Sequence, residues 1–262
     1  ISRAKQTIRD AGATFTMPPA RELQARTAVV QRVLYLIFNE GYTATSGEQV
    51  NRTDLTAEAV RLTRDLHRLS SGDNETAGLL ALMLLTEARR PARSTPSGDL
   101  VPLADQDRAL WNQVLINEGT ALATDALTTG PAGPYGLQAA IAAVHSEAQR
   151  PQDTDWPQVL ALYRVLDQVA PGPMVTLNMA VAVGMVEGPE AGLEFLAPLE
   201  SDRRVADHHL LYAVKGHLLD RAGQPEAAST AFESAGRRTA SMPEKRFLAG
   251  RAAELARRAL EG

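Results

Sequence analysis

Cysteine is absent from this 262-residue chain, which excludes disulfides, thiol nucleophiles and thiolate metal sites. Long apolar runs are also lacking. The best candidate, residues 78–85, is much shorter than the ~18 residues of a membrane-spanning helix. The sequence does not open with the charged and apolar segments of a secretory leader. We therefore expect a cytoplasmic protein that makes no contact with a membrane.

The sequence patterns of common catalytic sites are missing as well. There is no Gly-x-Ser-x-Gly, no His-Glu-x-x-His and no phosphate-binding glycine loop. The five histidines lack the spacing of metal ligands, except that His209 and His217 lie two helical turns apart. We predict no catalytic residue, no metal site and no cofactor, and we expect that the protein is not an enzyme.

Charge is nearly balanced, with 27 basic and 31 acidic residues and a net charge of -4. This balance argues against a chain that coats nucleic acid over its whole length. The distribution is uneven, however, because residues 1–32 are rich in basic groups that include Arg3 and Lys5. Only this first segment has the charge expected near DNA.

Apolar residues recur with the period of an α-helix along most of the chain. We predict an all-α fold, a helical bundle or solenoid, because no convincing series of strands occurs. Residues 90–100 contain the turn signal Ser97-Gly98 and form either a short hairpin or a loop. One expected helix starts near Thr53 or Asp54. The other expected helices span residues 21–40, 74–87, 105–128, 135–149, 156–169, 174–186, 189–199, 206–222, 225–238 and 243–260.

Two of these helices carry more specific expectations. Residues 78–85 are apolar nearly all round, so the helix over 74–87 is predicted to lie at the centre of the core. Gly41 is predicted to end the first helix as its C-cap. The predicted buried stripe of that first helix consists of Leu23, Val30, Leu34 and Ile37 or Phe38.

Small and aromatic residues in the last hundred positions follow the spacing of a tetratricopeptide helix pair. In such a pair the small residues allow close approach of the helices, and the aromatic ring fills the remaining gap. The clearer copy consists of Tyr212, Gly216, Leu219, Gly223, Ala228, Phe232 and Ala235. The fainter copy consists of Leu177, Ala180, Gly184, Gly188, Ala191 and Phe195.

Three polar clusters interrupt the apolar segments, and we expect them to meet in one partly buried network of carboxylates and guanidinium groups. Removal of one member would leave a buried charge unpaired, which is costly. The network is structural, faces a partner, or holds an anion for binding or acid–base chemistry; we favour the structural role. The clusters are Asn39, Glu40 and Tyr42; Arg89, Arg90 and Arg93; and Asp105, Asp107 and Arg108.

Many segments together resemble a known family. They are residues 34–42, 54–59, 78–85, 88–93, 105–108 with Trp111, 133–135, 138–145, 154–156 and 177–178. Their order and spacing resemble the C-terminal extension of extracytoplasmic-function (ECF) RNA polymerase sigma factors that carry a tetratricopeptide-like domain. Residues 1–9 resemble the closing helix of the sigma region that binds the promoter -35 element.

The resemblance implies a domain organisation and a function. Residues 1–12 would end the sigma region 4 helix, with Arg3 and Lys5 near DNA, and residues 13–20 would be a linker. A helical domain over 21–150 and tetratricopeptide-like repeats over 151–262 would follow. The implied function is regulation of transcription initiation through sigma regions 2 and 4 of the same chain and RNA polymerase core. Promoter DNA would be bound only through the sigma regions, and residues 105–108 would matter for activity.

Two other functions stay open from the residues alone. A helical-repeat scaffold would bind a peptide partner in a groove lined by Asn178, Tyr212 and arginines. A small-ligand sensor or an enzyme would use Glu40, Arg89, Arg93, Asp107 and Arg108 in a deep pocket.

Overall fold

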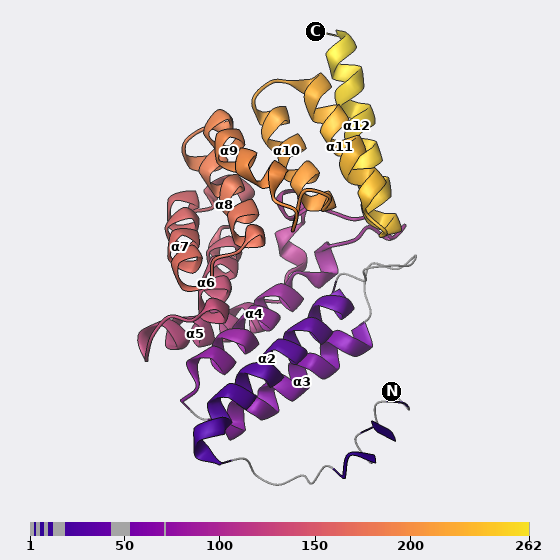
Figure 1. Ribbon diagram of the computed structural model, residues 1–262. Helices are drawn as coiled ribbons and strands as arrows, with labels where there is room; N and C mark the ends of the chain where they lie inside the picture. The colour runs from indigo at the N-terminus through magenta and orange to yellow at the C-terminus, as the bar shows by residue number, and fades with distance from the viewer. Residues whose placement is uncertain are drawn as a thin grey trace.

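The computed structural model describes residues 3, 6, 7, 10–12, 19–42, 53–70 and 72–261 of the chain. Helices dominate this part of the chain, which confirms the predicted all-α fold (Figure 1). Among the described residues, the extended pairing is a single antiparallel bridge between Ser94 and Leu100. Residues 90–100 therefore form a short hairpin-like turn rather than an open loop.

The α-helices follow one another as antiparallel neighbours, joined by short turns and five 3-10 segments. The α-helices are α2 (Ala20–Tyr42), α3 (Thr53–Leu69), α4 (Asn74–Ala88), α5 (Gln113–Thr128), α6 (Pro134–Glu147), α7 (Trp156–Val169), α8 (Pro173–Val186), α9 (Pro189–Leu196), α10 (His209–Arg221), α11 (Pro225–Arg238) and α12 (Met242–Glu261). The 3-10 segments are η1 (Arg90–Ala92), η2 (Leu103–Asp105), η3 (Arg108–Leu110), η4 (Pro151–Asp153) and η5 (Ala197–Ser201).

Helix α4 lies at the centre of the first half of the molecule, as its apolar sequence predicts. Nearly every residue from Thr76 to Leu85 is buried, because α2, α3, α5 and α6 all pack against this helix. A helix that is apolar all round has no face to offer to water. The surrounding helices are therefore arranged by the need to cover α4.

The crossing of α4 and α6 is unusually close. A Cβ atom on Gly78 would lie only 2.7 Å from the Cα of Gly136, so the two backbones touch. Glu75 reinforces this crossing, because its carboxylate accepts hydrogen bonds from the backbone N–H groups of Tyr135 and Gly136 at 3.2 and 3.3 Å. These N–H groups belong to the first turn of α6 and have no partner within the helix. The first turn of α4 thus fixes the start of α6.

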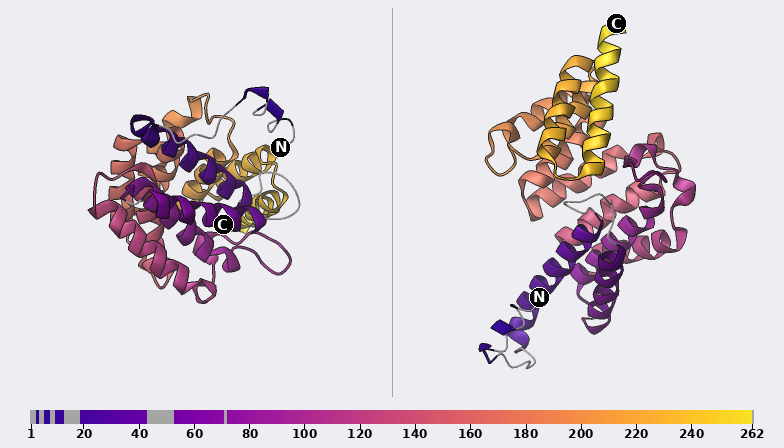
Figure 2. Two further views of the ribbon diagram at one scale, coloured as in Figure 1. Left: turned by 90° about the horizontal axis from the view of Figure 1, so that it is seen from below. Right: turned by 90° about the vertical axis from the view of Figure 1, so that its right-hand side faces the viewer.

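The second half of the molecule is a stack of antiparallel helix pairs that ends with α11 and α12 (Figure 2). Helices α10 and α11 approach closely at Gly216, because a Cβ atom added to this residue would lie 3.0 Å from the ring of Phe232 on α11. Gly188 and Gly223 open the α9 and α11 turns with positive φ angles of 105° and 71°. The predicted close packing of small residues against an aromatic ring is confirmed for the α10–α11 pair.

Packing continues without interruption across the predicted domain boundary at residue 150. One apolar cluster joins Leu137 and Ile141 of α6 to Val159 and Leu160 of α7 and to Met179 of α8. The two halves therefore share core side chains.

The predicted helix over 105–128 is wrong in its first eight residues. Gln106 and Trp111 have extended backbones, with ψ angles of 134° and 139°, and two 3-10 turns replace the helix there. The α-helix begins at Gln113, because the side chain of Asn112 accepts hydrogen bonds from the N–H groups of Val114 and Leu115. Because an N-cap residue has a non-helical backbone, the helix cannot extend from α5 back through Asn112 toward residue 105.

The predicted buried stripe of α2 is also partly wrong. Leu34 and Phe38 are buried, but Leu23 and Val30 are exposed, and Gln31 takes a core position. The amide of Gln31 is satisfied there, because its Nε2 donates to Asp73 Oδ2 and Thr76 Oγ1, both at 2.8 Å. A polar side chain with such partners can replace an apolar one in the core.

Gly41 does not cap α2, which continues to Tyr42. It is instead a point of close contact with α3, because a Cβ on Gly41 would lie 2.8 Å from the backbone N of Thr56.

The Gly78 contact gives a stability prediction. Replacing Gly78 with Ala forces a methyl group into the backbone of Gly136, so we expect the free energy of unfolding to fall by about 2–3 kcal/mol. Gly250 on α12 is the matched control, since a Cβ there meets no atom within 4 Å. Gly250→Ala should leave stability unchanged or raise it by up to about 1 kcal/mol. Urea unfolding followed by circular dichroism measures both, and equal effects of the two changes would contradict the close crossing.

Candidate functional site

The predicted site residues gather around the end of α4. Arg89, Arg90 and Arg93 lie in and beside η1, directly after α4, while η2 and η3 carry Asp105, Asp107 and Arg108. Segments η1 and η3 are in contact, and the N–H of Asn112 donates to the carbonyl of Ala88 at 2.9 Å. The last turn of α2 carries the remaining residues, Asn39, Glu40 and Tyr42.

Arg93 joins the end of α2 to this region. Its Nη1 donates to the backbone carbonyl of Tyr42, and its guanidinium lies 4.0 Å from the centre of the Tyr42 ring. Burial lowers the pKa of Arg93, and Tyr42 opposes this effect. Arg93 and Glu40 each have a further polar or electrostatic contact, so neither side chain is free. The clamp on Tyr42 fixes the direction of α2 relative to α4.

Arg108 joins η3 to the end of α6. Its Nη1 donates to the backbone carbonyls of His145 and Ala148, both at 2.6 Å. Its guanidinium also lies 4.5 Å from the centre of the Trp111 ring. The last carbonyls of a helix have no partner within the helix and carry partial negative charge. Arg108 therefore acts as a charged cap for the end of α6.

Arg89 and Arg90 have different surroundings. The Nε of Arg90 lies 2.7 Å from Glu87 Oε1, an ion pair between neighbouring helical turns. The Nε of Arg89 is buried and has no hydrogen-bond partner, and burial lowers the pKa of this guanidinium. Arg89 is close enough to Arg108 and His145 for its charge to act on both. No hydrogen bond or ion pair to a carboxylate within the described part of the chain neutralises the charge of Arg89.

The expected pairing of Asp105 and Asp107 with these arginines is wrong. No hydrogen bond or ion pair within the described part of the chain joins either carboxylate to Arg89, Arg90, Arg93 or Arg108. Asp107 instead caps η3, since its Oδ1 accepts from the N–H of Ala109 at 2.9 Å. Asp105 and Asp107 are both exposed. Arg93 and Arg108 bind backbone carbonyls and aromatic rings instead, and the two carboxylates stay in contact with water.

His145 was not among the predicted site residues, although Arg108 contacts its carbonyl. Its ring packs edge-on against Trp156, with ring centres 5.2 Å apart. Burial, followed by the charges of Arg89 and Arg108, lowers the pKa of His145 to about 4. At neutral pH the imidazole is therefore uncharged. A pattern of apolar and polar residues does not mark backbone carbonyl acceptors, so the sequence held no signal for this residue.

Among the described residues, no group of three or more His, Cys, Asp or Glu side chains is placed to hold a metal ion. In the same part of the chain, no helix has the length and apolar character needed to cross a membrane. Arg3 is described and exposed, whereas Lys5, the other predicted DNA-proximal residue, lies outside the described residues.

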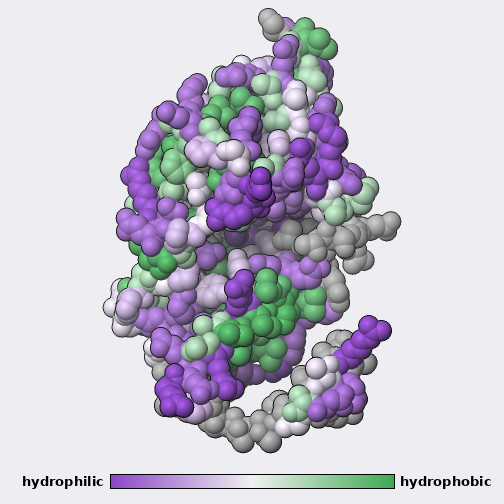
Figure 3. Space-filling view, in the orientation of Figure 1, coloured by the Kyte–Doolittle hydropathy of each residue, from purple (hydrophilic) through white to green (hydrophobic). Residues whose placement is uncertain are grey.

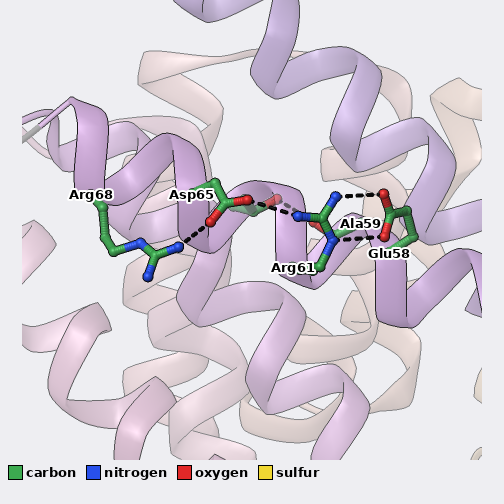
Figure 4. Close-up of polar contacts among 6 residues, drawn as sticks. Glu58, Ala59, Arg61, Asp65 and Arg68 are labelled. Carbon is green, nitrogen blue, oxygen red and sulfur yellow. Dashed lines mark hydrogen bonds and ion pairs between the residues drawn. The ribbon is translucent and has the colours of Figure 1, made fainter.

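Charged residues also line a crevice of about 570 Å³ between α3 and α5. Arg61 lies between Glu58 and Asp65 along the surface of α3 (Figure 4). Arg64 joins the two helices, with its Nη2 donating to Glu118 Oε2 at 2.8 Å. These guanidinium groups already have carboxylate partners, so this crevice has little charge to offer to a ligand.

One side of α2 is apolar and exposed. We call it the α2 apolar face; its side chains keep 44–63% of their surface accessible. Its residues are Leu23, Val29, Val30, Val33 and Leu36. The face forms a continuous hydrophobic patch on the surface in Figure 3. An apolar patch of this kind typically marks a site of protein–protein contact.

The residues named in the peptide-scaffold alternative do not form a groove of free polar groups. Tyr212 donates its hydroxyl to the carbonyl of Ala206 at 2.9 Å, and Arg238 lies 4.0 Å from the centre of its ring. Asn178 is exposed on α8. Tyr212 is therefore a packing residue of the helix pairs.

The fold and these contacts define an all-α protein of stacked helix pairs with a cationic cluster at the end of its central helix. Residues 26–127 match a family of unknown function, DUF6596. This segment contains the whole predicted cluster and most of the α2 apolar face.

An uncharacterized protein of Rhizobium meliloti (strain 1021) is similar to most of the chain. It is 43% identical over 235 residues, which cover 90% of this chain and 55% of the relative. The chain thus spans about half the length of this curated relative. No solved structure matches the chain significantly.

The contacts of Arg108 give a second stability prediction. Arg108→Met removes the donor to two carbonyls at the end of α6, so we expect the free energy of unfolding to fall by about 2–3 kcal/mol. Arg257 on α12 is exposed, and Arg257→Met is the control for loss of one positive charge; its effect should stay within about 0.5 kcal/mol. Denaturant unfolding compares the two variants. A similar small effect of both would show that Arg108 does not cap α6.

The environment of His145 predicts a pH dependence. Between pH 6.5 and about 4 the unfolded chain binds a proton at His145, whereas the folded protein does not. Stability from this group is therefore complete above pH 6.5 and falls as the pH drops through that window, by on the order of 3 kcal/mol. His209 and His217 also have lowered pKa values, so the wild type should be compared with His145→Asn. The difference between their unfolding free energies should shrink toward pH 4, and a constant difference would contradict the assignment.

Proposed function

We propose that this chain is the regulatory C-terminal part of a bacterial ECF sigma factor and that it modulates promoter-specific transcription initiation. In this proposal the α2 apolar face docks on sigma regions 2 and 4 of the same full-length protein. RNA polymerase core is bound by the assembled protein, and promoter DNA is bound through the sigma regions alone. The α2 apolar face is the observation that carries the proposal.

Two further observations support this assignment. The order of the polar motifs along the sequence resembles that of the ECF extensions, and those motifs fall inside the segment that matches DUF6596. The Rhizobium relative also has nearly half of its length outside the aligned region, so proteins of this kind contain additional chain to which α2 can dock.

The size of the α2 apolar face favours a partner that is tethered to it. Its five aliphatic side chains are about half exposed, so covering them contributes roughly 1 kcal/mol each. Free association of two proteins costs on the order of 4–15 kcal/mol in lost translational and rotational freedom. A partner in the same chain avoids most of this cost, because the linker supplies a high effective concentration. A patch of this size is therefore suited to docking within one polypeptide.

The Arg93 clamp gives the docking surface a defined position. By binding the carbonyl and the ring of Tyr42, Arg93 fixes the last turn of α2 to the end of α4. The face carried by α2 is then held at one angle to the rest of the molecule. In this proposal the predicted cluster residues act by positioning the docking surface.

A charge on the α2 apolar face tests the proposal. We expect Val33→Asp, introduced into the full-length protein, to change transcription from the promoter that this protein recognises by at least about fivefold. The reason is that a carboxylate cannot be buried in an apolar contact without a partner. Reconstituted transcription with RNA polymerase core measures the effect.

Val114 on α5 is 74% exposed and provides the matched control, Val114→Asp, which should leave transcription unchanged. Because Val33 is exposed, both variants should melt within a few degrees of the wild type. Unchanged promoter output from a folded Val33→Asp protein would overturn the proposed function.

A further inference from the structure

A cavity of about 430 Å³ lies beyond the arginine cluster, where η2 and η4 meet the ends of α6, α8 and α10 and the first residue of α7. Its volume falls within the range of small-molecule sites. It does not involve the α2 apolar face, and nothing in the proposed function requires it. The lining residues that carry the argument are Asp105, Arg108, His145, Trp156, His217 and Arg221.

The wall of this cavity is rich in cationic and neutral hydrogen-bond donors. Arg108 and Arg221 contribute two guanidinium groups against the single carboxylate of Asp105, and no ion pair of the described residues uses any of the three. The Nε atoms of Arg108 and of Arg89, whose charge acts on Arg108, are buried and have no hydrogen-bond acceptor. Buried polar atoms without partners are rare in folded proteins. This part of the molecule has more donors than its own acceptors satisfy.

Part of the remaining wall is apolar. Trp156, with its ring against His145, faces the cavity together with Leu103 and Met185. An inorganic ion would use only the guanidinium groups and would leave this surface in contact with water. A ligand that joins an anionic group to an apolar or aromatic body would cover both kinds of wall at once.

We propose that this cavity binds a small organic anion, a carboxylate or phosphate carried on an apolar or aromatic body. The anionic group accepts hydrogen bonds from the guanidinium groups of Arg108 and Arg221, and His145 is near enough to respond to its charge. The body of the ligand packs on Trp156 and Met185. The Nη1 of Arg108 already donates to two backbone carbonyls, so the Arg108 guanidinium keeps its position when the ligand binds.

The ring Cε1–H signals of the five histidines provide the readout in NMR titrations, assigned by replacing each histidine in turn. Four probes are added separately: phenyl phosphate, phenylacetate, inorganic phosphate and benzyl alcohol. We expect phenyl phosphate, phenylacetate or both to shift the signals of His145 and His217. Inorganic phosphate and benzyl alcohol should bind at least about tenfold more weakly. The two organic anions distinguish a phosphate from a carboxylate ligand.

His67 is the internal control. It lies in the α3–α5 crevice, where the neighbouring guanidinium groups are paired, so its signal should not move. A shift of His67 equal to that of His145 would reveal general binding of anions to arginine-rich surface and would overturn the proposal. If inorganic phosphate binds as tightly as both organic anions, the organic part of the ligand contributes nothing to binding, and the proposal of an organic anion is overturned.

Variants locate the binding site. Arg221→Met should weaken binding of the organic anion about tenfold, because it removes one of two guanidinium groups. Arg257→Met, which removes the same charge from an exposed position on α12, should leave the affinity unchanged within about twofold. His217→Glu introduces a negative charge at the cavity and should abolish the shift of His145. The proposal is overturned if no organic anion shifts His145, or if folded Arg221→Met and His217→Glu proteins bind like the wild type.

Discussion

The burial of nearly all of α4 between Thr76 and Leu85 is the constraint on which the rest of the structure depends. A helix with apolar residues on all sides must be covered from every direction, and α2, α3, α5 and α6 do this. The contact between Gly78 and Gly136 brings α6 as close as two backbones allow, and α6 in turn shares its other face with α7 and α8. The stack of helix pairs therefore starts from the requirement to keep one helix out of water.

The same constraint explains the cationic cluster. The chain leaves the core at the end of α4 with three arginines within five residues, where charge favours the negative end of the helix dipole. These side chains are too close to the core to be fully solvated. Arg93 and Arg108 donate hydrogen bonds to backbone carbonyls and pack on aromatic rings. These contacts replace hydrogen bonds that the guanidinium groups would otherwise make to water. Carbonyl acceptors do not cancel a positive charge as a carboxylate does, so Arg108 keeps its charge.

The helices themselves could be predicted from the sequence because their apolar period is long and regular. The errors fall where a single polar side chain overrides that period. Asn112 delays the start of α5 by capping it, and Gln31 enters the core of α2 because Asp73 and Thr76 accept its amide protons. The membership of the arginine cluster was predictable, but its partners were not. Opposite charges suggest pairing in a sequence, whereas backbone carbonyls occur at every residue and give no pattern.

The two surfaces that remain open have different chemistry and lie on different elements. The α2 apolar face consists of aliphatic side chains of one helix, and the cavity combines guanidinium groups with an aromatic wall from the ends of several elements. Arg93 is bound to Tyr42 at the end of α2, while Arg108 is bound to the end of α6 at the cavity, and the charge of Arg89 acts on both arginines. Arg221 belongs to α10 and has no described contact with α2, so a change there alters the cavity without altering the docking surface. Because the linkage between two binding events is reciprocal, an organic anion that affected docking would itself bind with an affinity that depends on docking.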